Sequence, residues 1–160
     1  MTEEAKLTID RLDRKILRIL QDRGRISNVQ LAREVGLSPT PCLERVRKLE
    51  KNGVIKGYHA RIDPDKLGSP LLVFVEITLS KTSSDVFAEF SAAARKTDEI
   101  LECHLVSGDF DFLLKARVAD MAAYRKLLGE TLLNMPGVNE SRTYVVMEAV
   151  KQDNKVVIKG

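Results

Sequence analysis

Apolar residues in the first third of the chain recur at helical spacing in three consecutive segments. Isoleucine and leucine repeat every three or four residues in the first segment, residues 9–24. The second and third segments, residues 27–36 and 38–53, open on Ser27 and Ser38, a residue type favoured at helix N-caps, and both end at glycine. The pattern predicts one longer helix followed by two further helices, separated by short turns.

The apolar period changes from helical to two at residue 71. Alternating segments predict four strands and helical segments predict two helices between them. The strands are expected at 71–80, 100–108, 111–118 and 138–150, the helices at 83–97 and 119–137, and a short fifth strand at 155–159. This βαββαβ order predicts a ferredoxin-like fold with both helices on one face of an antiparallel sheet. The fold class is therefore α+β.

The segment between these two patterns divides the chain into domains. Residues 54–63 alternate well enough for a strand or hairpin, as in the wing of a winged helix-turn-helix. Residues 63–70 carry two prolines, a glycine and several charges, which is typical of a linker. We therefore expect a helical first domain at 1–62, a linker at 63–70 and a ferredoxin-like domain at 71–160.

One face of the predicted sheet has no helix to cover it. Leu72 and Phe74 point toward that face. Because an exposed apolar patch of this kind is unfavourable, we expect a second subunit to cover it. This arrangement predicts a two-fold homodimer.

The second and third helices, joined at Gly36–Ser38 behind a longer first helix, predict a helix-turn-helix. In that motif the second helix of the pair enters the major groove, so we expect residues 1–62 to be a DNA-binding domain. A two-fold homodimer would present two such helices to a palindromic site. The polar and basic side of this helix holds the candidates for contacts with phosphates and base edges: Ser38, Thr40, Pro41, Arg45, Arg47, Lys48 and Lys51. The alternative is an ordinary solvated helix with a Glu44–Lys48 pair at i,i+4.

Charge is distributed unevenly between the two halves. Residues 1–62 carry a net charge of +6 and residues 63–160 a net charge of −3. This asymmetry favours contact between the first half and a polyanion, although chance segregation of surface charge gives the same counts. The composition is that of a soluble protein, and the longest apolar run, residues 70–75, is too short to span a membrane. An acidic, polar N-terminus without a hydrophobic signal region predicts a cytoplasmic location.

Enzymatic chemistry finds little support in the sequence. It contains no phosphate-binding glycine loop and no metal-ligand cluster. Cys103 and His104 are adjacent on a strand, so their side chains point to opposite faces and cannot act as nucleophile and base. We therefore expect no catalytic residue, no metal and no cofactor, with Cys42 and Cys103 as reduced structural thiols.

A glycine and two aspartates interrupt the apolar strands at "VSGDFDF", residues 106–112. Gly and Asp are common turn residues, so a tight turn between two strands explains them. The same residues also offer carboxylates that accept an ammonium and backbone N–H groups that bind a carboxylate. The residues alone leave both interpretations open.

Nearly the whole chain resembles the leucine-responsive/asparagine-regulator family of bacterial transcription factors, the feast/famine regulators. The resemblance is carried by residues 10–58, "LLVFVEITL", "ECHLVSGDFDFLLK", "YRKLLGETLL" and "PGVNESRTYVVMEAVK". It implies a helix-turn-helix spanning Asn28–Arg47 and a C-terminal domain for dimerisation, higher assembly and amino-acid sensing. The implied partners are double-stranded DNA, further copies of the chain up to an octamer or larger, and a small amino acid.

The resemblance also implies an effector site between dimers, with leucine as the expected effector. Its residues would be Gly108, Asp109, Phe110, Asp111, Met121, Tyr144, Val145 and Val146. A bacterial, nucleoid-associated regulator that activates or represses transcription is the function implied. Whether the amino acid favours dissociation or rearrangement of the assembly stays open, and a sensing adaptor that does not bind DNA is the other non-enzymatic alternative.

Overall fold

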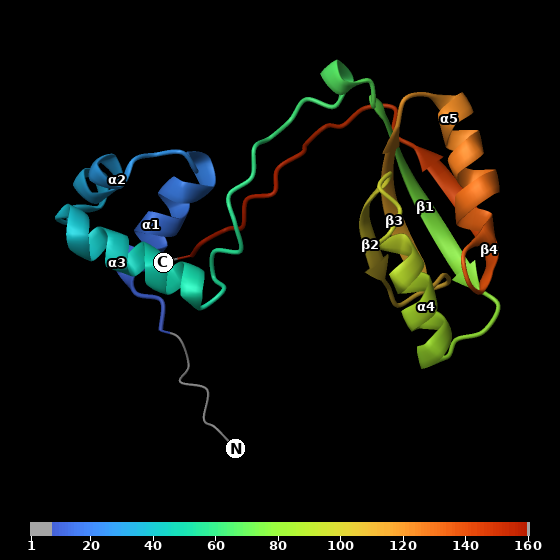
Figure 1. Cartoon of the computed structure of the whole chain (residues 1–160), viewed down its shortest axis with the longest axis horizontal. Coiled ribbons are helices and arrows are strands. Elements are labelled where there is room, and N and C mark those ends of the chain that lie inside the picture. The colour runs from blue at the N-terminus through green and yellow to red at the C-terminus, as the bar shows by residue number, and fades with distance from the viewer. Residues whose placement is uncertain (1–7, 160) are drawn as a thin grey trace. The chain divides into compact units, whose positions relative to one another are not determined.

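The computed structural model describes residues 8–159, which form two compact units (Figure 1). One unit contains the chain up to Arg61 together with the segment from Gln152 onward, and the other contains Ile62–Lys151. The first seven residues of the predicted DNA-binding domain and Gly160 lie outside the described residues.

Three helices build the first unit: α1 (Arg11–Asp22), α2 (Asn28–Val35) and α3 (Pro39–Lys51). Asp10 caps α1, and Gly36 ends α2 with a φ of +82°, a backbone conformation that glycine adopts without steric cost. One apolar cluster holds the helices together: Ile16, Leu31, Ala32, Val35, Cys42, Val46 and Leu49. All three helices were predicted at these places from the apolar period.

The strand or hairpin expected over residues 54–63 is not formed. The backbone amides of Val54 and Ile55 both donate to the carbonyl of Leu49, at 2.9 and 3.2 Å. Their half-buried side chains pack against the core of the first unit. This segment therefore closes the C-terminal end of α3 instead of pairing with a second strand.

The end of the chain also differs from expectation. Residues 155–159 form no strand, and the segment from Gln152 onward lies against α1 in the first unit. The side-chain amide of Gln21 makes two hydrogen bonds with the backbone of Val156, and Arg18 donates to the carbonyl of Ile158 at 2.8 Å. Side-chain contacts with α1 thus take the place of a neighbouring strand. The predicted domain range 71–160 therefore differs from the observed second unit, which ends before Gln152.

The second unit is a four-stranded antiparallel sheet with the strand order β2-β3-β1-β4. The chain order is η1, β1, α4, β2, β3, α5, η2, η3, β4. Their bounds are η1 Asp65–Leu67, β1 Leu71–Leu79, α4 Ser84–Ala94, β2 Ile100–Leu105, β3 Phe112–Val118, α5 Met121–Lys126, η2 Leu127–Thr131, η3 Leu132–Asn134 and β4 Val138–Val145. The strand order is that of the ferredoxin-like fold, as predicted.

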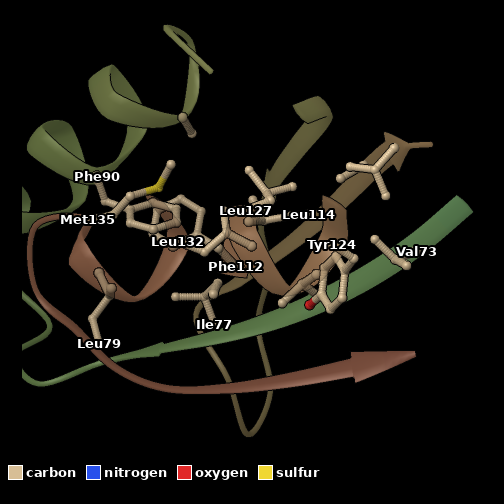
Figure 2. Packing of buried hydrophobic residues seen from close by; sticks show 14 residues of the cluster. Val73, Ile77, Leu79, Phe90, Phe112, Leu114, Tyr124, Leu127, Leu132 and Met135 are labelled. Carbon is tan, nitrogen blue, oxygen red and sulfur yellow. The ribbon is translucent and has the colours of Figure 1, made fainter. Parts of the chain in front are cut away.

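Both helices of this unit pack on one face of the sheet. Figure 2 shows Phe90 of α4 and Tyr124 of α5 in the same apolar cluster as the inward-facing residues of β1 and β3. Phe90 and Phe112 lie with ring centroids 4.5 Å apart at the centre. The opposite face, which bears Leu72 and Phe74, carries no helix, as the period-two pattern predicted.

The turn before β4 depends on a glycine. Gly137 has a φ of +75°, and a Cβ added there would lie 2.4 Å from Cγ1 of Val86 on α4. Only a residue without a side chain fits between the turn and the helix.

Candidate DNA-binding face and effector site

The helix-turn-helix is held at its turn by a side chain as well as by its core. Asn28, at the start of α2, donates from Nδ2 to the backbone carbonyl of Pro39 at 2.7 Å. The first turn of α2 is thereby linked to the first turn of α3. Asn28, predicted as a DNA-binding residue at the start of the motif, thus links its two helices in the fold.

One side of α3 is buried and the other is exposed. Cys42, Val46 and Leu49 face the core, and Leu43 is half-buried. Thr40, Arg47, Lys48 and Lys51 are exposed on the other side. Among residues 8–159 these four side chains have no ion pair or hydrogen-bond partner. We call Thr40, Arg47, Lys48 and Lys51 the free face of α3. The Glu44–Lys48 pair of the alternative interpretation, a solvated helix, is not formed.

The remaining predicted DNA contacts are placed differently. Ser38 occupies the N-cap position of α3, but its exposed hydroxyl makes no capping hydrogen bond, and Pro41 is half-buried. Arg45 turns toward α1: its Nη1 donates to Oδ2 of Asp10 at 2.6 Å and to Oδ1 of Asp13 at 2.7 Å. Arg45 is therefore engaged within the protein, unlike the free face of α3.

The Gly-Asp-Phe-Asp sequence forms the turn between β2 and β3, as predicted. Asp111 fixes this turn to β1, because its Oδ2 accepts a hydrogen bond from the amide of Leu79 at 2.7 Å and its own amide donates to Ile77 at 2.9 Å. Gly108 has a φ of +152° and open space around it, and Phe110 is half-buried. Asp109 is exposed, and its carboxylate has no partner among the described residues. The turn thus contains one structural and one unengaged carboxylate.

The other predicted effector residues lie at the opposite end of the sheet. The amide of Val146 donates to Leu72 near the start of β1, whereas the turn is bonded to Leu79 at its end. Seven residues of strand separate these points by roughly 23 Å. Met121 lies just beyond Val118, which pairs with Leu71 at that same far end. Met121, Tyr144 and Val145 are 49%, 45% and 43% exposed there.

One chain therefore does not bring the predicted effector residues together. The sequence carried a signal for this separation, because β3 leads away from the turn before reaching Met121. A site that used both groups would need two chains.

The helix-free face of the sheet combines an apolar centre with ion pairs. Phe74 pairs across the strands with Tyr144 and Lys115. Lys115 is bonded to Glu102 at 2.7 Å, and this bond, followed by the one from His104, lowers the pKa of the Glu102 carboxyl. Arg142 lies 3.9 Å from Glu76 on the same face. The apolar patch that the sequence predicted is thus bordered by charged pairs.

Three contacts in the first unit carry structural roles that sequence reasoning missed. Asp13 is 7% exposed, the only buried charged residue in the described part of the chain. Gln21 binds the C-terminal segment, and Tyr58 donates to Glu50 at 3.0 Å. Burial, and then this hydrogen bond, raises the pKa of Tyr58 to about 12. The contacts of Asp13 with Arg45, of Gln21 with Val156 and of Tyr58 with Glu50 each join residues at least eight positions apart, so periodicity gave no signal for them.

The side chains that commonly hold metal ions are dispersed. In residues 8–159 no three His, Cys, Asp or Glu side chains are grouped to bind a metal ion. Burial raises the pKa values of the Cys42 and Cys103 thiols. No helix within the same range has the length and hydropathy to cross a bilayer.

Two family models match the chain. Residues 9–56 match a winged helix-turn-helix DNA-binding domain, and residues 72–156 match the Lrp/AsnC ligand binding domain. The leucine-responsive regulatory protein of Salmonella typhimurium is 67% identical over 151 residues, which cover 94% of this chain and 92% of the relative. The protein of the same name from Escherichia coli K12 is 66% identical with the same coverage.

Solved structures agree with these matches. A transcriptional regulator from Neisseria meningitidis, in complex with L-methionine, has a TM-score of 0.89 and 35% identity, covering 94% of this chain and 97% of its own. A feast or famine regulatory protein from M. tuberculosis, also complexed with L-methionine, has a TM-score of 0.83 and 31% identity, with 95% and 100% coverage.

Proposed function

Because the chain belongs to the Lrp/AsnC family of transcription regulators, we propose that the free face of α3 reads double-stranded DNA and that leucine modulates this binding. The observation that carries the DNA assignment is the division of α3 into a buried side and an exposed basic side without protein partners. Ser38 and Thr40, near the N-terminal end of α3, suit contacts with phosphates or base edges, and Arg47, Lys48 and Lys51 suit phosphates and guanine.

A salt series on charge-removal variants tests this proposal. The probe is a duplex selected by this protein from a random library, with fluorescence anisotropy as the readout. Arg47→Ala with Lys48→Ala should weaken binding and flatten the plot of log K against log salt by about 0.9 for each phosphate that the variant no longer neutralises. Lys66→Ala, which removes an exposed charge from the linker, is the matched control and should change neither quantity. Unchanged affinity in the double variant at every salt concentration would refute the DNA assignment.

The effector is proposed to be an amino acid bound between chains. The carboxylate of Asp109 or Asp111 would accept the ammonium, and backbone N–H groups beside Gly108 would bind the carboxylate. Met121, Tyr144, Val145 and Val146 of another chain would line the pocket for the side chain, because one chain holds the two groups at opposite ends of its sheet. Leucine is proposed because the relatives are named leucine-responsive, although two structural neighbours hold L-methionine.

Amino-acid control requires that the ligand favour one assembly or DNA-binding state over another. A coupling free energy of about 1–3 kcal/mol is typical for such control. Anisotropy titrations of the selected duplex in the presence of L-leucine, L-methionine or L-asparagine measure this coupling for each amino acid. No change in duplex affinity with any of the three would contradict the effector assignment.

We also propose that the helix-free face forms a homodimer, and that dimers assemble into an octamer or larger. The half-buried Phe74 and the 45% exposed Tyr144 at the centre of this face, with ion pairs at its border, support burial against a second copy. Phe74→Glu should place a charge in that contact and shift the sedimentation coefficient toward the monomer; an unchanged coefficient would rule the face out. The setting proposed for the assembly is the bacterial cytoplasm, in association with the nucleoid.

A further inference from the structure

Asp10 and Asp13 form a closed hydrogen-bonding group with Arg45. The capping box of α1 uses one oxygen of each carboxylate: the amide of Asp13 donates to Oδ1 of Asp10 at 2.8 Å, and the amide of Asp10 donates to Oδ2 of Asp13 at 3.2 Å. Nη1 of Arg45 donates to the two remaining oxygens, at 2.6 and 2.7 Å. All four carboxylate oxygens are therefore engaged, and a single nitrogen of α3 joins both residues.

The burial of one carboxylate and the charge of the other favour a positively charged side chain at this position of α3. Asp13 is buried, and a buried carboxylate without a partner is strongly unfavourable. The amide of Asp13 and the guanidinium of Arg45 hold the pKa of the Asp10 carboxyl below its usual range. The Asp10 carboxylate therefore stays charged at neutral pH and continues to hold Arg45.

We propose that Arg45 is a positioning residue, which fixes the helix α3 on the N-terminal cap of α1 and does not itself contact DNA. This proposal rests on the proposed function, because it takes α3 as the DNA-reading helix. Arg45 lies on the same helix as the free face, two residues before Arg47. If α3 lost this attachment and rotated about its axis, the free face would be displaced. Contacts with base edges depend on that orientation, whereas contacts with phosphates at non-specific sites tolerate more displacement.

Asp10→Asn separates positioning from direct contact, because the two roles predict changes of opposite sign. Asparagine caps helices as well as aspartate does, so α1 keeps its N-cap while Arg45 loses its ion pair with Asp10 and keeps the one with Asp13. If Arg45 contacted DNA, removal of the acidic charge would release it and raise affinity. If Arg45 positions α3, affinity for the selected duplex should fall by roughly tenfold, the effect of one charge-assisted hydrogen bond.

Arg45→Ala and a matched control complete the experiment. Arg45→Ala should lower affinity for the selected duplex, leave affinity for a random-sequence duplex unchanged, and leave the slope of log K against log salt unchanged. Glu44→Gln removes an acidic charge from the same helix outside this hydrogen-bonding group, and it should not lower affinity. Thermal unfolding of each variant identifies a temperature at which all variants are folded. If Arg45→Ala does not fold, Asp10→Asn alone distinguishes positioning from direct contact with DNA.

The opposite outcome would overturn the proposal. A slope flattened by about 0.9 or more in Arg45→Ala, together with higher affinity in Asp10→Asn, would identify Arg45 as a phosphate contact. Failure of the proposed function is a separate result, seen as unchanged binding when Arg47 and Lys48 are replaced.

Discussion

The carboxylate of Asp111 binds the backbone amide of Leu79, 32 residues earlier in the chain, at 2.7 Å. This bond joins the β2–β3 turn to the end of β1, where Leu79 is almost fully buried. A residue proposed for effector binding therefore also has a structural role, and the two roles respond differently to substitution.

Replacement of Asp111 by alanine should destabilise the protein, because the buried amide of Leu79 loses its acceptor. The expected cost is about 1–3 kcal/mol of unfolding free energy. Asp111→Asn keeps an acceptor oxygen and should fold normally while losing the charge offered to an ammonium. Chemical denaturation measures the first effect, and equal stability of the two variants would contradict the structural role.

The neighbouring carboxylate provides the test of effector binding without a cost in stability. Asp109 is exposed and unengaged among the described residues, so Asp109→Asn should leave the unfolding free energy within about 0.5 kcal/mol of the unsubstituted protein. Loss of the leucine response in Asp109→Asn but not in Asp111→Asn would assign the ammonium to Asp109, and the reverse result would assign it to Asp111. A full response in both variants would exclude this turn as the ammonium site.

Gly137→Ala should destabilise the second unit. The positive φ and the 2.4 Å approach to Val86 mean that an added methyl group strains the turn and displaces α4. The expected loss is roughly 1–3 kcal/mol. Gly129→Ala is the matched control, because its Cβ meets nothing within 4 Å and its helical backbone favours alanine. Similar melting temperatures for the two variants would contradict this account.

Tyr58 should titrate at unusually alkaline pH. Its pKa of about 12, against an ordinary value of 10, means that the folded protein prefers the neutral phenol. Its contribution to stability is therefore complete below pH 10 and is lost as the pH rises from 10 toward 12. Ultraviolet difference titration of the phenolate, compared with Tyr58→Phe, checks this. A tyrosine that titrates near pH 10 and is absent from the variant would contradict the raised pKa of Tyr58.

Gln21→Ala should loosen the C-terminal segment from α1. The side chain makes two exposed hydrogen bonds with Val156, so the expected loss is about 1 kcal/mol. Val157→Ala, at an exposed position of the same segment, should have no measurable effect. Hydrogen exchange of the Val156 amide reports the change directly, and equal protection in both variants would contradict it.

The features predicted correctly from the sequence depend on local patterns. The N-cap at Ser27, the turn at Gly36 and the burial of alternate residues in β1 each follow from the chain within a few positions. The features predicted wrongly depend on distant partners. Residues 155–159 have the composition of a strand but find side chains of α1 instead of a sheet edge.

The functional residues divide in the same way. Helical periodicity correctly placed Arg47 and Lys48 on the exposed side of α3. It could not show that Arg45, on the flank of that side, meets two carboxylates more than 30 positions earlier. Nor could it place the Gly108 turn and Val146 at opposite ends of one sheet, because the pairing of β1 with β4 decides that arrangement.

The discontinuous first unit has a consequence for biosynthesis. Arg61 donates to the carbonyl of Gln152 at 3.2 Å, so this unit is made of two stretches of chain that residues 62–151 connect. The ribosome synthesises the second unit first and the segment that binds α1 afterwards. The three helices can pair early, but the DNA-binding unit acquires its remaining contacts only once the segment from Gln152 onward has emerged, at the entropic cost of closing a long loop. A nascent chain that has not yet reached Gln152 would therefore lack this part of the DNA-binding unit.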